Sequence, residues 1–114
     1  MFSPRMTLSS AAGFCHRFGT GLKAGADLLK LLHSEASHGP PGQREAMRLL
    51  AEGVKRGEQL STVMDDQPFF PPLMAAMTRV GEATGRIERV LLTLAAHYQH
   101  QLTTRRMFIQ SPAG

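Results

Sequence analysis

The chain has 114 residues, of which 42% are hydrophobic and 19% charged, and its formal net charge is +4. This length fits one domain, and this composition is typical of a globular protein rather than a disordered one. The single cysteine excludes an internal disulfide, and because no apolar run approaches the length of a bilayer span, we expect a soluble chain.

The positive net charge permits an anionic partner, which could be nucleic acid, a lipid surface or an acidic protein. Lysines and arginines are scattered and mostly alternate with acidic residues, except at Lys55-Arg56 and Arg105-Arg106. This pattern favours a mixed-charge surface and no nucleic-acid partner. A basic helical nucleic-acid-binding module is the alternative, and it requires that Lys and Arg cluster on one face.

The N-terminal part predicts two helices that meet at a glycine. After a flexible lead-in over residues 1–6, Thr7 or Ser9 can cap a first helix that ends at Gly25. A second helix is predicted over about 27–36. The apolar residues that recur at helical spacing are Leu8, Ala11, Ala12, Cys15, Phe18, Gly19 and Leu22, then Leu28, Leu31 and Leu32. Each set forms one stripe, which predicts a buried face.

The middle of the chain repeats this arrangement. A Gly- and Pro-rich loop over 37–42 precedes a third helix over about 43–56, and a short fourth helix follows over about 59–66. Their predicted buried residues are Ala46, Met47, Leu50, Ala51 and Val54, then Leu60, Val63 and Met64. The segment around Gly57 matches the segment around Gly25, 32 residues earlier, in its glycine stop and the apolar triad that follows. The same kind of corner is therefore predicted twice.

The last part predicts a helical hairpin. Pro71 and Pro72 suit the first turn of a fifth helix, because proline lacks the N–H that has no partner there. Gly85 ends this helix, and a sixth follows almost without a loop, so the two must run antiparallel. Their predicted buried faces comprise Leu73, Met74, Met77, Val80 and Gly81, then Ile87, Val90, Leu91, Leu94, Ala95, Tyr98 and Leu102. The predicted fold is an all-α, antiparallel bundle of about six helices, with the fourth the shortest.

Several residue pairs have the composition of a catalytic or metal site, but not the required geometry. Cys15 and His16 are helix neighbours about 100° apart, so they do not face each other, and Cys15 lies on the apolar stripe. His97 and His100 have a spacing that can bind a metal, but no third ligand follows on that face. We therefore predict no catalytic residue, no metal site and no cofactor.

Glu82 is the acidic residue with two competing interpretations. We expect it to pair with Arg79 or Arg86 across one helical turn. The alternative is a calcium site that it shares with other carboxylates, namely Asp65, Asp66 and Glu88. The adjacent Gly81 lies on the predicted buried face, which indicates close approach of a second helix.

Three sequence motifs resemble the type II secretion system F family. Phe69-Phe70-Pro71-Pro72 is followed by Gly81-Glu82-Ala83-Thr84-Gly85 and then by Leu94-Ala95-Ala96-His97-Tyr98. The family has a Phe-Pro, a Gly-Glu-x-x-Gly and a Leu-Ala-x-x-Tyr-like run in this order. The corners Ala24-Gly25-Ala26-Asp27-Leu28 and Gly57-Glu58-Gln59-Leu60-Ser61 are similar to two further family motifs. The resemblance covers about residues 7–108, and its motif and interaction residues are Phe70, Pro71, Gly81, Glu82 and Gly85.

The resemblance implies a role in a machine of the bacterial inner membrane. Family members carry such domains on the cytoplasmic face, each followed by membrane-spanning helices, so residues 109–114 would begin a membrane-proximal segment, and missing spans downstream would provide the membrane contact. The implied function is non-enzymatic. The domain would couple the cytoplasmic secretion or pilus ATPase, and other inner-membrane subunits, to pilin assembly. Phe14 and Leu92 lie beside the apolar stripes, and if both are partly exposed they predict a homodimer.

Overall fold

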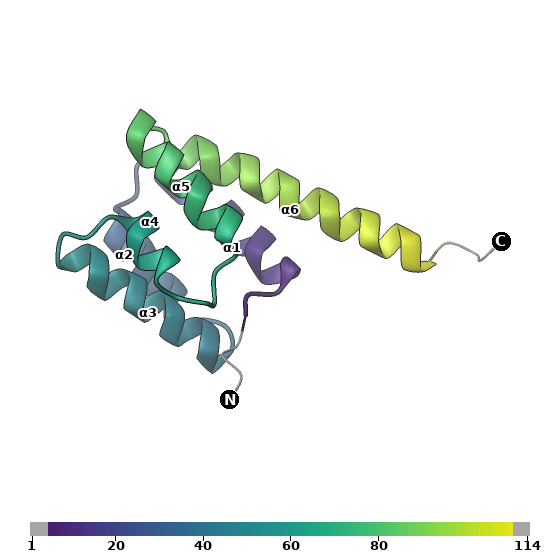
Figure 1. Ribbon diagram of the computed structural model, residues 1–114, viewed down its shortest axis with the longest axis horizontal. Coiled ribbons are helices and arrows are strands. Elements are labelled where there is room, and N and C mark those ends of the chain that lie inside the picture. The colour runs from purple at the N-terminus through teal and green to yellow at the C-terminus, as the bar shows by residue number, and fades with distance from the viewer. Residues whose placement is uncertain (1–4, 111–114) are drawn as a thin grey trace.

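A computed structural model of the chain describes residues 5–110, which form six α-helices and no strand (Figure 1). The helices are α1 (Leu8–Lys23), α2 (Leu28–Glu35), α3 (Pro41–Lys55), α4 (Leu60–Asp65), α5 (Pro72–Thr84) and α6 (Ile87–Gln110). The prediction of an all-α bundle of about six helices with a short fourth helix is confirmed.

The helix starts follow from two kinds of residue. The side chains of Thr7 and Asp27 each accept a hydrogen bond from the backbone N–H three residues further on, at 3.0 and 3.1 Å, and so cap α1 and α2. Pro41 and Pro72 are the first residues of α3 and α5. Helix α3 therefore begins two residues earlier than expected, because the Gly- and Pro-rich loop ends in a proline that suits the first helical turn.

Three helix pairs are joined by the same glycine corner. The corner glycines Gly25, Gly57 and Gly85 have φ angles of +90°, +90° and +70°. Four residues before each of them stands another glycine, whose carbonyl accepts a hydrogen bond from the N–H that follows the corner, at 3.0, 3.0 and 2.8 Å. These earlier glycines are Gly21, Gly53 and Gly81. The pattern is the Schellman motif, in which a left-handed residue lets the last carbonyls of a helix find partners.

The earlier glycine of each corner also lets the next helix pack closely. A Cβ atom built on Gly21, Gly53 or Gly81 would come closer than 3.0 Å to Leu31, Val63 or Ile87, respectively. The expectation that Gly81 lies on a buried face is therefore confirmed. Each corner combines a sharp turn with direct contact between consecutive helices.

The predicted buried face of α5 was partly wrong. Leu73 and Val80 are 45% and 50% exposed, whereas Ala75 and Thr78 are buried beside Met74. The buried face is rotated relative to the prediction, because α5 packs against α4 as well as α6. Small and polar residues can occupy such a face where two helices approach closely, and hydrophobicity alone does not identify them.

The core is organised around α1 and α6, which form the most extensive helix contact (Figure 1). Phe14 is fully buried, so the expectation that it is partly exposed was wrong. Its ring centroid lies 5.3 Å from that of Phe18 and 6.3 Å from that of Phe70, in an aromatic cluster. Leu92, by contrast, is half-buried, as expected. The aromatic cluster ties α1 to the turn that precedes α5.

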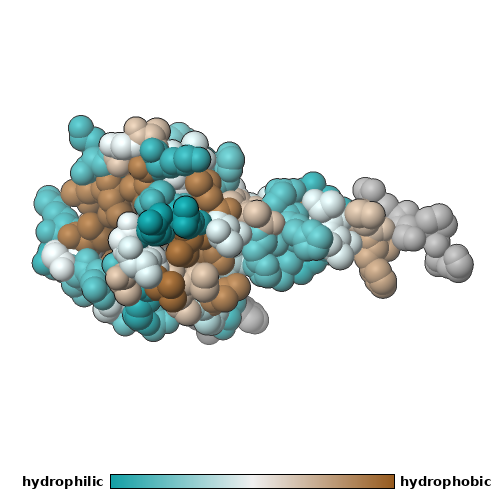
Figure 2. All heavy atoms as spheres, turned by 90° about the horizontal axis from the view of Figure 1, so that it is seen from above, coloured by the Kyte–Doolittle hydropathy of each residue, from teal (hydrophilic) through white to brown (hydrophobic). Residues whose placement is uncertain are grey.

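The C-terminal part of α6 projects away from the remaining helices (Figures 1 and 2). Met107, Phe108 and Ile109 are exposed there by 65%, 84% and 73%. At the other end, Met6 is buried and its N–H donates a hydrogen bond to the Phe69 carbonyl at 2.8 Å, which departs from the expected flexible lead-in. Residues 1–4 of that lead-in and residues 111–114 of the predicted membrane-proximal segment lie outside the described part.

Within residues 5–110, none of the helices has both the length and the apolar character that a bilayer span requires.

Candidate functional site

Four of the five motif residues serve packing or backbone geometry just before, within and just after α5. Phe70 is buried in the aromatic cluster, and Pro71 directly precedes α5 as its N-cap residue. Gly81 lies against the backbone of Ile87, while Gly85 supplies the left-handed turn into α6. These positions explain the residue types through packing and backbone geometry. A direct contact with another protein remains a prediction for them.

Glu82, the fifth motif residue, connects α5 to the start of α4. Its carboxylate accepts a hydrogen bond from the Ser61 backbone N–H at 3.1 Å and a short one from the Ser61 hydroxyl. Gln59, the N-cap residue of α4, makes no side-chain cap of its own. Glu82 therefore caps α4 from a neighbouring helix, and its negative charge also complements the positive end of the α4 dipole.

The expected pairing of Glu82 with Arg79 or Arg86 was wrong, because no such ion pair forms among the described residues. Sequence reasoning missed Ser61 because it lies 21 residues away from Glu82. The sequence did contain one indication of this contact, because Ser61 and Glu82 both belong to motifs that are similar to those of the family. Among residues 5–110, no group of three or more His, Cys, Asp or Glu side chains is arranged to hold a metal ion.

Cys15 and the three histidines considered with it lie in different environments. Cys15 is buried, and this burial raises the pKa of its thiol to about 12. His16 is exposed, as are His97 and His100. A thiol with so high a pKa carries almost no thiolate at neutral pH, so it is a poor nucleophile.

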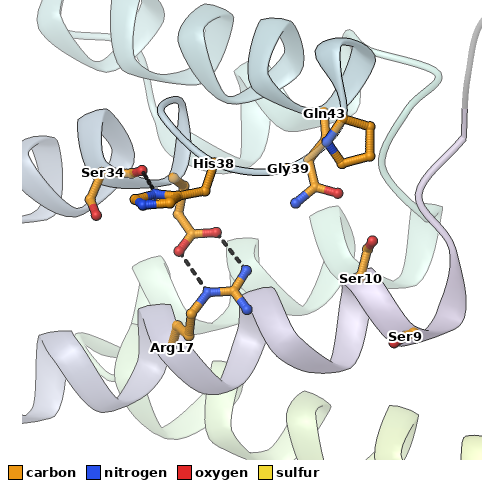
Figure 3. Close-up of a pocket in the computed structure, with 9 residues that line it drawn as sticks. Ser9, Ser10, Arg17, Ser34, His38, Gly39 and Gln43 are labelled. Atoms are coloured by element: carbon orange, nitrogen blue, oxygen red, sulfur yellow. Dashed lines mark hydrogen bonds and ion pairs between the residues drawn. The ribbon is translucent and has the colours of Figure 1, made fainter.

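A polar hollow of about 490 Å³ lies between α1, the α2–α3 loop and the start of α3 (Figure 3). The Arg17 guanidinium donates two hydrogen bonds to the Glu35 carboxylate there, at 2.9 and 2.8 Å. The hydrogen bond to Glu35 raises the pKa of Arg17, so the guanidinium stays positively charged opposite this carboxylate. Ser9, Ser10 and His38 also line the hollow. Sequence reasoning missed this pair because its members lie 18 residues apart.

A shallow groove runs along α1 and α6 on another face, and we call it the α1/α6 groove. It consists of two adjoining hollows of about 530 and 420 Å³ that share Leu92 and Ala96. Its other lining residues are Ala12, His16, Lys23, Arg86, Glu88, Arg89, Thr93, Ala95 and Gln99. The lining is basic at one end and mostly small or apolar along its length.

The remaining paired arginines do not add to a basic face. Arg48 forms ion pairs with Glu45 and Glu52 at 2.6 and 2.8 Å, and Arg56 pairs with Glu58 at 2.8 Å. Together with the Arg17–Glu35 pair, these contacts confirm the predicted mixed-charge surface over much of the molecule. The basic end of the α1/α6 groove departs from this pattern, because its cations form no ion pair among the described residues.

The contacts described so far define an all-helical domain whose motif residues serve helix packing and capping. The family described as "Type II secretion system (T2SS), protein F" matches residues 14–111. The chain belongs to this family, whose members act in type II secretion and type IV pilus assembly. The predicted resemblance is confirmed.

Individual relatives support this assignment. The type 4 fimbrial assembly protein PilC of Pseudomonas putida is 29% identical over 104 residues, which cover 90% of this chain and 26% of that protein. The protein transport protein HofC homolog of Escherichia coli is 34% identical over 99 residues, which cover 83% of this chain and 25% of that protein. The type IV pilus assembly protein PilC of Thermus thermophilus is 23% identical over 96 residues, 82% of this chain and 24% of that protein. The chain thus spans about a quarter of the length of these relatives.

Proposed function

We propose that this chain is a cytoplasmic domain of an inner-membrane platform protein in a type II secretion or type IV pilus assembly machine. The observation that carries the proposal is the family match, which extends over residues 14–111 and therefore includes all of α2 to α5. The names of the relatives, which are pilus assembly and protein transport proteins, support the same class of machine.

In this proposal the domain works as a protein-interaction module that couples the cytoplasmic ATPase to pilin assembly. Two carboxylates support a non-enzymatic role, because they are engaged in capping and ion pairing. Glu82 caps α4, and Glu35 is neutralised by Arg17. The surface is therefore the part of the domain available for partners, and the motif residues act by keeping its helices in place.

Deletion and complementation test this proposal. Cells that lack the intact protein should lose pilus assembly or secretion, and the wild-type gene should restore it. Glu82→Ala, which leaves the start of α4 without its cap, should restore it less well at reduced protein level, whereas Glu52→Ala on the exposed face of α3 should complement fully. Normal assembly or secretion in the deletion strain would contradict the proposal.

The coupling to an ATPase has its own test. The intact protein, purified in detergent with the ATPase of the same machine, should form a complex that survives gel filtration. The purified domain itself should hydrolyse no ATP, and this activity is measured on the same sample. ATP hydrolysis by the domain alone would contradict the non-enzymatic role.

A further inference from the structure

The α1/α6 groove has a shape in which a third helix can pack. On α1, Ala12, His16 and Lys23 line it, and on α6 Leu92, Ala96 and Gln99 do so. Within each helix these residues recur at spacings of three, four and seven, so they form two parallel rows along one face. The row on α1 spans about 16 Å, or three helical turns, at a rise of roughly 1.5 Å per residue.

The groove is open at its base because the underlying α1 residue, Gly19, has no side chain. A Cβ on Gly19 would lie 2.9 Å from the Leu92 Cγ and 3.2 Å from the Leu91 Cβ. The absence of a side chain at Gly19 thus lets Leu92 lie down between the two helices. Ala95 and Ala96 continue the low surface beyond it. Small residues at such positions let another backbone approach closely.

Three cations and a single carboxylate line one end of the groove. Lys23, Arg86 and Arg89 line this end, and none of them forms an ion pair with a carboxylate in the part of the chain that the structure describes. Glu88 is the one acidic residue that also lines it. The lining therefore carries a net charge of about +2 at neutral pH.

Two of these cations lie at the start of α6, where a positive charge destabilises the helix. Arg86 directly precedes α6 and its carbonyl accepts from the Val90 N–H at 3.1 Å, while Arg89 lies in the first turn of α6. The N-terminus of a helix is its positive end, so cations there are unfavourable. Lys23, in the last turn of α1, is favourable in this respect. An anionic group outside the described residues would offset the charge of both arginines.

We propose that the α1/α6 groove binds an amphipathic helix of another subunit of the same machine, with acidic residues at one end. Its apolar side would lie on Leu92 and Ala96, and its acidic end would contact Lys23, Arg86 and Arg89. This proposal rests on the proposed function for the existence of the machine. The three cations favour a helix with acidic residues, and the small and apolar residues along the groove give that helix a surface to bury.

Site-specific photocrosslinking in the intact protein, in its own cells, tests the occupant. A benzophenone amino acid is placed at Ala96, which is exposed in the groove, and as a matched control at Ala76, an exposed alanine of α5. The expected result is an adduct from position 96, absent from position 76. Mass spectrometry should map it to a helix-forming segment of another subunit with clustered Asp or Glu.

Charge reversal tests the basic end. The double variant Lys23→Glu/Arg89→Glu should lower the crosslink yield about tenfold, since both substitutions place a negative charge opposite the acidic helix. Arg44→Glu combined with Lys30→Glu, at exposed positions of α3 and α2 outside the groove, makes the same total charge change of −4 and should leave the yield unchanged. Exchanging the partner's acidic residues for lysine should restore crosslinking to the double variant.

The other outcomes overturn the proposal and identify the alternative. An adduct with a second copy of this protein makes the groove a homodimer interface, and an adduct with lipid or nucleic acid assigns the cations to those partners. No adduct from position 96 means that the groove is unoccupied. The deletion strain distinguishes this failure from failure of the proposed function. If wild-type complementation succeeds while position 96 gives no partner, only the groove proposal is wrong.

Discussion

Replacing Gly81 by alanine should destabilise the domain although alanine is the better helix former. The propensity gain is at most about 1 kcal/mol. Against it, the new Cβ would lie 2.9 Å from the Ile87 Cα and 3.3 Å from the Ile87 nitrogen, so the start of α6 would have to shift. Overpacking of this kind costs roughly 1–3 kcal/mol. We expect a net loss of about 1 kcal/mol, which lowers the melting temperature by roughly 4–8 °C for a domain of about 100 residues.

Gly21→Ala is the matched control, since Gly21 occupies the same place in the first corner. Its Cβ would contact the ends of the Leu31 side chain, with 2.7 Å to Cδ2 and 2.9 Å to Cδ1. Leu31 is half-buried and can rotate, so the change in stability should stay within about 0.5 kcal/mol of zero. Thermal and urea unfolding followed by circular dichroism measure both variants. Equal stabilities of the two variants would refute the argument that backbone contact makes Gly81 irreplaceable.

Four further outcomes are expected. Ser61→Ala should lower the free energy of unfolding by roughly 1–2 kcal/mol, because it removes a hydrogen-bond donor to Glu82. A double-mutant cycle with Glu82→Gln, measured by urea unfolding, should show that the two residues are energetically coupled. Additive losses would exclude this coupling. Tyr98→Phe should leave urea stability unchanged or raise it by up to about 1 kcal/mol, because the Tyr98 hydroxyl is buried without a partner among the described residues; a clear loss would reveal a hydrogen bond. Since burial raises the pKa of Cys15 from 9.0 to about 12, alkylation at pH 8 should be roughly a thousandfold slower in the native than in the urea-unfolded chain, and comparable rates would place Cys15 at the surface. The unfolded thiol ionises near 9.0 and the folded one only near 12, so stability is retained below pH 9 and falls as the pH rises from 9 towards 12; Cys15→Ala should make the pH dependence measured by urea unfolding less steep.

The helix boundaries were predictable because a few residue types determine them locally. Gly25, Gly57 and Gly85 adopt left-handed backbone angles at the three corners, and the sequence marks each of them as a helix stop. Pro72 likewise marks the start of α5. Such signals depend on backbone sterics within a few residues, so they can be read without knowledge of the tertiary structure.

The side-chain contacts were less predictable because they depend on which helices meet. Phe14 was considered as a partly exposed residue but is fully buried, since α1 is covered on more than one side. Glu82 was assigned to a neighbour on its own helix, whereas its partner Ser61 lies on α4. The sequence marks both residues as motif members, but the pairing requires the placement of α4 against α5. The α1/α6 groove was foreshadowed only by the expectation that Leu92 is partly exposed.

The long helix α6 also has a mechanical consequence. Its 24 residues contain neither glycine nor proline, so it is a stiff rod about 36 Å long at roughly 1.5 Å per residue. One end is anchored at the Gly85 corner and along α1, while the other projects beyond the globule (Figure 1). A pull or twist at Ile109 would therefore reach Ala96, about 20 Å away, with little bending in between. Displacement of the projecting end of such a rod would therefore be felt at its contact with α1.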